Sequence, residues 1–378
     1  MKLLFWSSLV FILYTYLGYP LLLWLQSRLA GKEIQKQPIT PFVSVVMSAL
    51  NEENRIGARL DNLFAQQYPA EHLEIIVVSD GSTDRTGEII RSYADRNVRL
   101  LELAERSGKA IAVNLGVSEA RGEVIVFADA RQRFEPDVVS QLVANFNDSS
   151  VGCVSGELMF LEGADSNIQA EMGAYWKYEK WIRKMESRTG SVVGATGAIY
   201  AIRKSLYKPL QAGTVLDDVL TPLNVVMQGY RCIFDGSAKA YDAVSKDTAQ
   251  EWTRKVRTLA GNWQLLSLNP SLAVPILNLL WCRFISHKIF RLIVPFALVI
   301  LLVSGLLVGR GFYLIATLVQ LLFYLISLAG LLVPAIRRVR LVNLVYFFVV
   351  MNVAAIAGFW KWLTGRCNTA WCNATSPV

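Results

Sequence analysis

Residues 73–84 read LEIIVVSDGSTD, an apolar run that ends abruptly in small and polar residues. Residues 42–53, FVSVVMSALNEE, repeat this arrangement, and residues 123–127 form a third short run that Ala-Asp-Ala-Arg follows. Such runs, bounded by polar loops, predict buried strands. Because helical patterns separate them, the sequence predicts an α/β fold with a mostly parallel sheet, whose ligand lies beyond the carboxyl ends of the strands.

Two charged residues follow these strands at positions suited to a nucleotide. Asp80 ends the second strand, where a carboxylate can accept from a uracil imide N–H, and an acid near the first loop can accept from ribose hydroxyls. Lys109 follows Ser107 and Gly108 at the start of a helical pattern, where its ammonium can meet a diphosphate. Neither contact alone is specific to one class of enzyme.

Four ordered motifs resemble the donor-binding half of family-2 glycosyltransferases with the GT-A fold. They are SVVMSALNEE at 44–53, VVSDGSTD at 77–84, SGKAIAVNLG at 107–116 and VIVFADA at 124–130. The resemblance continues through 194–197 and 216–219 to 254–257. Membrane-bound members, such as the synthases of hyaluronan, chitin and cellulose, also flank this domain with helices.

The resemblance implies roles for residues of the donor site. Glu52 and Asp80 would hold the uridine side of a UDP-sugar, and Lys109 would lie near its phosphates. Asp129 would be the first acid of the family's D-x-D motif, which binds a divalent cation, Mg²⁺ or Mn²⁺. Arg131 stands in place of the second acid, so either its guanidinium meets the diphosphate directly, or another acid holds the ion, or Arg131 only caps the strand end.

The resemblance also implies the catalytic acids. Asp218 would be the general base that takes the proton from the acceptor hydroxyl in an inverting displacement, and Asp217 stands where the family usually has Glu. The leaving diphosphate then needs cationic help from a metal or from Arg and Lys.

Residues 254–258, RKVRT, keep only the arginine of the Q-x-x-R-W motif of processive synthases. Arg254 and Arg257 either bind the donor diphosphate or lie on a basic helix face that attracts anionic lipid head groups, with phosphate favoured for Arg257. Trp176 and Trp263 are the candidate acceptor-binding aromatics, and the alternative is that they anchor the core or the membrane interface.

The charge of the chain is divided at Glu251. The chain carries a net charge of +8, yet no Asp or Glu follows Glu251 and twelve Lys and Arg do, so the part up to that residue sums to −4. A nucleic-acid-binding protein would place its positive charge on the folded domain, which this pattern excludes as a main function.

Four apolar stretches are long enough to span a bilayer: residues 3–25, 292–308, 312–333 and 341–363. Arg28, Lys32 and Lys36 follow the first stretch, and three arginines lie between the last two, so the positive-inside rule places both loops in the cytosol. Residues 265–290, which two prolines interrupt, are expected as a helix in the membrane interface, with a fifth span as the alternative.

The predicted organisation is therefore an N-terminal transmembrane helix (1–28), a cytosolic GT-A domain (39–263), an amphipathic interfacial region (264–290), three transmembrane helices (291–365) and a short tail (366–378). The predicted protein lies in the plasma (inner) membrane and transfers a sugar from a nucleotide sugar to a growing polysaccharide or a lipid-linked acceptor, with possible export of the glycan. The alternatives are transfer of one sugar to a polyprenyl phosphate, or nucleotide-sugar binding without catalysis.

Overall fold

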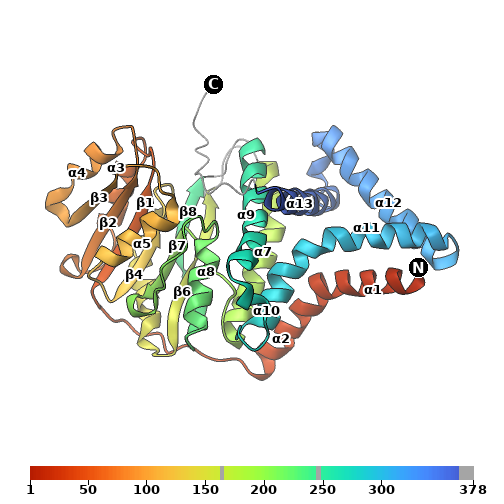
Figure 1. The fold of residues 1–378 in the computed structure, drawn as a ribbon, viewed down its shortest axis with the longest axis horizontal. Helices are drawn as coiled ribbons and strands as arrows, with labels where there is room; N and C mark the ends of the chain where they lie inside the picture. Colours follow the sequence, from red (N-terminus) through yellow and green to blue (C-terminus); the bar gives the residue numbers. More distant parts are fainter. Residues whose placement is uncertain (162–165, 244–247, 366–378) are drawn as a thin grey trace.

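The computed structural model describes residues 1–161, 166–243 and 248–365, so the predicted tail at 366–378 lies outside the described residues. A sheet covered by helices forms one end of the molecule, and long helices extend from it at the other (Figure 1). Helices α7 (Ser166–Thr189) and α9 (Thr248–Leu268) stand between these two parts.

The three strands expected from sequence are confirmed as neighbours in one sheet. They are β1 (Val43–Ala49), β2 (Leu73–Asp80) and β4 (Val124–Ala128), and β3 (Val98–Leu103) extends the sheet beyond β2. All these pairs are parallel, with Met47 opposite Ala128 and Ala49 opposite Ser79. The polar residues that follow β1, β2 and β4 therefore meet at one edge of the sheet.

The other half of the sheet is largely antiparallel, so the sheet is mixed. The strand order is β3-β2-β1-β4-β7-β6-β8-β5. Strand β7 (Ile199–Arg203) pairs antiparallel with both β4 and β6 (Val151–Leu161), while β8 (Arg231–Ala243) runs parallel to β6 and antiparallel to β5 (Arg133–Phe134). Since β7 starts where β4 ends, the loop before β7 lies at the same edge as Asp129.

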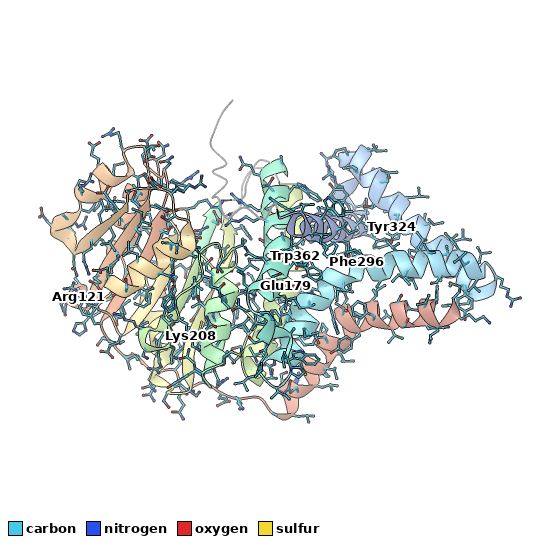
Figure 2. All side chains as sticks on the ribbon, viewed as in Figure 1. Arg121, Glu179, Lys208, Phe296, Tyr324 and Trp362 are labelled. Carbon is cyan, nitrogen blue, oxygen red and sulfur yellow. The ribbon has the colours of Figure 1, made fainter. Side chains whose placement is uncertain are left out.

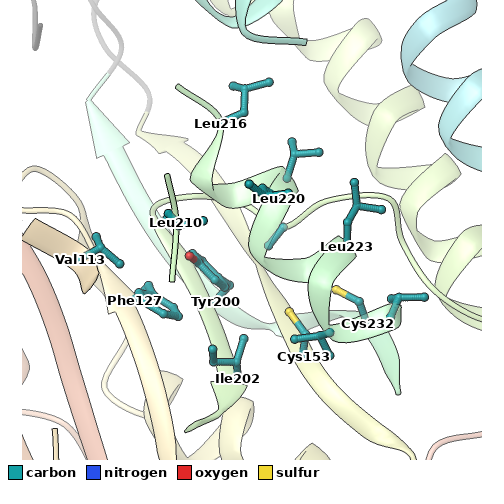
Figure 3. Close-up of a cluster of buried hydrophobic side chains, with 14 of the residues drawn as sticks. Val113, Phe127, Cys153, Tyr200, Ile202, Leu210, Leu216, Leu220, Leu223 and Cys232 are labelled. Carbon is teal, nitrogen blue, oxygen red and sulfur yellow. The ribbon is translucent and has the colours of Figure 1, made fainter. Parts of the chain in front are cut away.

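Helices cover both faces of the sheet because successive strand side chains point to opposite sides. One face packs against α3 (Ile56–Phe64), α4 (Thr86–Arg91) and α6 (Val138–Val143). The other packs against α5 (Lys109–Glu119) and α8 (Asp217–Val226). On that side Phe127 and Tyr200 stack with ring centroids 4.4 Å apart, beneath the start of α8 (Figure 3).

In the described part of the chain, four helical stretches are long and apolar enough to cross a membrane. They are Lys2–Leu29, Trp281–Val308, Gly311–Leu332 and Arg340–Leu363. The first joins α1 (Lys2–Leu13) and α2 (Tyr19–Leu29), the second joins α10 (Trp281–Phe284) and α11 (Phe290–Val308), and the others are α12 (Gly311–Leu332) and α13 (Arg340–Leu363). In the most apolar window of α12 only 17% of the residues are buried, as expected of a surface that faces lipid.

The expected interfacial helix over residues 265–290 does not form as one element, which corrects that prediction. Residues 265–268 complete α9, and Pro270–Ala273 form a short 3₁₀ turn. Trp281 then begins the second apolar stretch, eleven residues earlier than expected. The prolines break the helix after α9, while the basic residues near 283–291 are accommodated inside the longer stretch by polar partners on α7.

The sheet domain and the long helices share a hydrophobic core. Phe284, Ile289 and Leu292 belong to the same buried cluster as α5 and α8, and Tyr19 and Leu23 pack against Ile182 of α7. The helical part therefore fixes the orientation of α7 relative to the sheet.

Candidate active site

A cavity of about 820 Å³ opens at the carboxyl edge of the parallel strands. It brings together residues that are far apart in the sequence. Of the residues predicted to form the site, those that line it are Glu52, Lys109, Asp129, Arg131, Trp176, Asp217, Asp218, Arg254 and Arg257. Asp80 and Trp263 are not among the described lining residues.

Lys109 is the centre of an ion-pair network in this cavity. Its Nζ atom lies 3.2 Å from Asp129 Oδ1 and 3.3 Å from Asp217 Oδ2. Burial lowers the pKa of Lys109, but the carboxylates of Asp129, Asp217 and Asp218 outweigh burial, and the net shift is upward. The side chain is therefore an ammonium at every physiological pH.

Asp80 does not line the cavity but shapes the loop that carries Lys109. Its side chain is buried, and its two carboxylate oxygens accept from the backbone N–H groups of Ser107 at 2.6 Å and Gly108 at 2.9 Å. Gly108 has φ +92°, a conformation that favours glycine, and Lys109 begins α5 directly after it. Asp80 therefore fixes the loop that positions Lys109, the residue predicted to lie near the donor phosphates.

Asp217 and Asp218 are the first two residues of α8, where the helix N-terminus favours negative charge. Burial, and then the charge of Asp217, raise the pKa of Asp218 to about 6, although Lys109 lowers it. A carboxylate with such a pKa accepts a proton more readily than an ordinary Asp and is still largely ionised at neutral pH. The position meets the electrostatic requirement for a general base.

The loop before β7 closes over this acid pair. The backbone N–H of Ala195 donates to Asp218 O at 2.8 Å. A Cβ atom on Gly197 would lie 3.0 Å from Asp218 Oδ2, closer than neighbouring atoms normally approach. A larger residue at position 197 would therefore force the Asp218 side chain to shift.

Arg131 pairs with Asp242, an acid that the sequence gave no reason to select. Its Nη2 atom forms an ion pair with Asp242 Oδ2, and Gln132 Nε2 donates to the same oxygen at 2.9 Å. Asp242 is 1% exposed and lies near the end of β8, a strand whose partner cannot be inferred from local sequence. Arg131 is therefore held by a buried carboxylate while still lining the cavity.

The cavity also has polar lining residues that the sequence did not predict, among them Arg55 and Arg183. Arg55 Nη1 donates at 3.0 Å to Glu52, a predicted site residue that lies three positions after the end of β1. Arg183 of α7 donates to Thr196 Oγ1 at 2.7 Å, and both residues line the cavity. No local signal separates Arg183 from the other basic residues of α7, because its role depends on the packing of that helix.

Helix α9 places Arg254 and Arg257 on the wall of the cavity. Burial, and then the charge of Arg131, lower the pKa of Arg254, so these two cations lie close enough to repel each other. Two glycines allow α9 to pack closely on both sides. A Cβ on Gly261, in α9, would lie 2.8 Å from Leu216. A Cβ on Gly358, in α13, would lie 2.9 Å from the backbone nitrogen of Ala260 in α9.

The two candidate tryptophans have different surroundings. Trp176 lines the cavity, donates to the backbone oxygen of Leu158 at 3.2 Å and lies against Phe160, with ring centroids 5.5 Å apart. Trp263 instead stacks on Trp362 of α13, with centroids 5.7 Å apart (Trp362 is labelled in Figure 2). The structure therefore places Trp263 in the packing between α9 and α13, and only Trp176 at the cavity.

The chain is similar in sequence to known glycosyltransferases. The family model "Glycosyl transferase family 2" matches residues 44–210. The chain is 28% identical over 243 residues to the probable glycosyltransferase YdaM of Bacillus subtilis (strain 168), and 24% identical over 229 residues to poly-β-1,6-N-acetyl-D-glucosamine synthase of Staphylococcus aureus (strain MSSA476). Each match covers 59% of this chain and 55% of the relative, so the chain spans about half the length of these curated relatives.

A solved structure shares the fold over nearly the whole chain. The mannosyltransferase PcManGT from Pyrobaculum calidifontis, in complex with GDP-Man and Mn²⁺, superposes with a TM-score of 0.72 at 24% identity, covering 96% of this chain and 99% of that one. The chain therefore has a GT-A-type fold, and its residues 44–210 match the glycosyl transferase family 2 model.

Proposed function

We propose that this protein is a membrane-bound inverting glycosyltransferase, which moves a sugar from a nucleotide sugar to a growing polysaccharide or a lipid-linked acceptor. One observation carries the proposal: the cations suited to a diphosphate and the carboxylate suited to a general base line the same cavity. The four apolar helical stretches support membrane attachment, with the catalytic domain on the cytosolic side of a bacterial-type plasma membrane.

The donor would bind with its diphosphate among Lys109, Arg131, Arg254 and Arg257. Each of these side chains lines the cavity, and guanidinium groups match phosphate oxygens well. As the bond to the anomeric carbon breaks, negative charge grows on the diphosphate, and cations already fixed in place stabilise it. The nucleoside would lie near Glu52, at the end of β1.

The base of the donor is proposed to be uracil, as the sequence motifs suggest, and guanine is the competing choice. The name of the staphylococcal relative specifies an N-acetylglucosamine polymer, whereas PcManGT was solved with GDP-Man. Since both relatives are distant, the two donors must be compared directly.

Asp218 would remove the proton of the acceptor hydroxyl as that oxygen attacks the anomeric carbon. With a pKa of about 6, the side chain is mostly ionised at pH 7 and yet basic enough to accept the proton. Asp217 would keep Lys109 in place through the contact at 3.3 Å, so that the donor and the base keep a fixed distance.

A divalent cation fits this site only with a reduced set of protein ligands. Among the described residues, no three Asp, Glu, His or Cys side chains are grouped as a metal would require. Asp129 is the residue that would hold the ion, because Mg²⁺ is commonly bound by one or two carboxylates together with substrate phosphates. When bound, the ion would neutralise charge on the diphosphate, a task that Arg131 shares.

The aromatic wall formed by Trp176 and Phe160 would contact the acceptor sugar. Aromatic faces match the apolar faces of pyranose rings, and this wall lies at the end of the cavity away from β1. Because residues 254–258 lack the glutamine and tryptophan of processive synthases, the proposal does not require a long product.

The experiment is a nucleotide-release assay on the full chain in lipid nanodiscs, with UDP- and GDP-linked sugars, each tested with Mg²⁺, Mn²⁺ or EDTA. Release from one donor, and its loss in an Asp129→Asn variant, would support the proposal. Tight binding of a nucleotide sugar without release, also in the presence of membrane-lipid extracts as a source of acceptor, would favour the alternative of a binding protein.

A further inference from the structure

Two cations lie near enough to Asp218 for their charges to act on it: Arg183, which lines the cavity, and Lys288, which is not one of the lining residues. Glu179, Arg183 and Glu186 are spaced four and three residues apart, so they lie on one face of α7. His287 contacts both acids of this face, with Nδ1 2.8 Å from Glu186 Oε1 and Nε2 3.1 Å from Glu179 Oε2. Lys288 follows His287 directly, so this double contact brings Lys288 near Arg183, which lies between the two acids on α7.

Glu179 and Glu186 also have partners other than His287. Glu179 also pairs with Arg291, and Glu186 accepts from the Tyr19 hydroxyl at 2.6 Å (Glu179 is labelled in Figure 2). Within the described residues, no carboxylate oxygen lies within 4.0 Å of the nitrogen atoms of Arg183 or Lys288. The two cations thus have no anionic partner in direct contact.

The positive charges of Arg183 and Lys288 nevertheless act on Asp218, the proposed general base. Burial and Asp217 raise the pKa of Asp218, while the charges of Lys109, Lys288 and Arg183 lower it. Arg183 lines the cavity and uses one N–H group on Thr196 Oγ1, which leaves other N–H groups for a ligand. Two half-buried cations without a counter-charge are costly, and an anion would offset that cost.

The position of Lys288 indicates where that anion comes from. Lys288 lies in the first turns of the apolar stretch Trp281–Val308, at the junction between the sheet domain and the membrane-length helices. Trp176 and Arg183 are separated by seven residues of α7, or about 10 Å along the helix, which leaves room for a sugar between the aromatic wall and the cations. An anionic group at this depth would belong to a molecule anchored in the bilayer.

We propose that Arg183 and Lys288 bind the phosphate group of a lipid-anchored acceptor and so orient its accepting oxygen toward Asp218. The inference rests on the proposed function, and it narrows the acceptor from glycans in general to a lipid that carries phosphate. Phosphate is the natural ligand because arginine binds two of its oxygens at once and lysine adds a compact charge.

The test measures binding of farnesyl phosphate and of uncharged farnesol to the full chain in phosphatidylcholine nanodiscs. The wild-type protein should bind the phosphate at least ten times more tightly than the alcohol. Arg183→Gln and Lys288→Gln should each remove most of this difference, whereas Arg183→Lys should keep much of it. Lys184→Gln is the matched control, because Lys184 is the next residue of α7 but is exposed and does not line the cavity.

Two further arms distinguish the sources of phosphate. Inorganic phosphate at millimolar concentration, or phosphatidylglycerol added to the nanodiscs, should compete only weakly if the lipid-anchored acceptor phosphate is the ligand. Equal binding of farnesyl phosphate to the wild type and to both Gln variants would overturn the proposal, as would full competition by phosphatidylglycerol. Nucleotide-sugar binding, measured on the wild type and on Lys184→Gln, tests the proposed function separately. Its absence from the wild type would contradict the proposed function without changing what the farnesyl phosphate comparison says about Arg183 and Lys288.

Discussion

Lys109 Nζ lies 3.3 Å from Asp217 Oδ2, and this contact joins the first residue of α5 to the first residue of α8. The two helices belong to parts of the chain that are more than one hundred residues apart. Because Lys109 also contacts Asp129 at 3.2 Å, one ammonium links the proposed phosphate site with the acid pair that contains the proposed base. Donor binding and proton removal, as proposed, would therefore be electrostatically coupled.

Replacing Lys109 by Met should affect both ends of the cavity. Donor affinity should fall by about tenfold or more, because a cation is lost beside the diphosphate. Lys109 also lowers the pKa of Asp218, so its removal should move the acidic limb of the pH–rate profile above pH 6. Donor titration and a pH series measure both effects, with the exposed Lys208→Met variant as control (Lys208 is labelled in Figure 2). An acidic limb that stays in place would contradict the coupling.

Gly197→Ala should impair turnover more than donor binding. The new methyl group would lie 3.0 Å from Asp218 Oδ2 and 3.2 Å from Asp218 Cβ, so the carboxylate must move. The required shift is a few tenths of an ångström, smaller than the misplacement of ~1 Å that can cost a hundredfold, so kcat should fall about tenfold. Gly57→Ala, on α3, is the control, since its Cβ would meet nothing closer than 3.6 Å. Equal kcat values for the two variants would exclude a constrained carboxylate.

Arg131→Met should destabilise the domain as well as weaken the diphosphate site. The change leaves Asp242, which is 1% exposed, without its guanidinium partner. Breaking a buried ion pair on one side costs about 3–5 kcal/mol, and the lower end applies because Arg131 is one-third exposed.

Thermal unfolding in nanodiscs would report this loss, and adding Asp242→Asn should recover much of it by removing the unpaired charge. Arg85→Met breaks only the exposed pair with Glu88 and should leave the unfolding temperature nearly unchanged. A lower unfolding temperature in Arg131→Met that Asp242→Asn does not raise would argue against the pair as the cause.

The pH dependence of transfer should reveal the proposed base. Asp218 acts only when ionised, and its pKa is raised to about 6. The rate should therefore rise about tenfold per pH unit below pH 6 and level off above it. The measurement is kcat between pH 4.5 and 8. A profile that stays flat down to pH 4.5 would indicate an acid with an ordinary pKa.

The sequence predicted the elements whose signal is local. The strands that became β1, β2 and β4 are short apolar runs, and the motif acids after them meet at one sheet edge because the strands are parallel. Three of the four apolar helical stretches begin and end within four residues of the predicted limits, and the second begins eleven residues early.

What could not be predicted depends on contacts between distant segments. The antiparallel half of the sheet brings Asp242 to Arg131, although 110 residues separate them, and neither sequence neighbourhood signals the pairing. Trp263 and Trp176 look alike in sequence, yet α13 covers one and the cavity exposes the other. Likewise, His287 and Arg291 are accommodated in an apolar helix because Glu179 and Glu186 of α7 pair with them.

The most direct test compares donor binding and sugar transfer in Asp218→Asn and wild-type protein, with both quantities measured on the same nanodisc preparation. Asn keeps the size of the side chain and loses the basic oxygen, so the donor dissociation constant should stay within about threefold while kcat falls about a thousandfold or more. Retained transfer in the variant, or loss of donor binding to the same extent as turnover, would contradict the claim that this cavity transfers a sugar with Asp218 as its base.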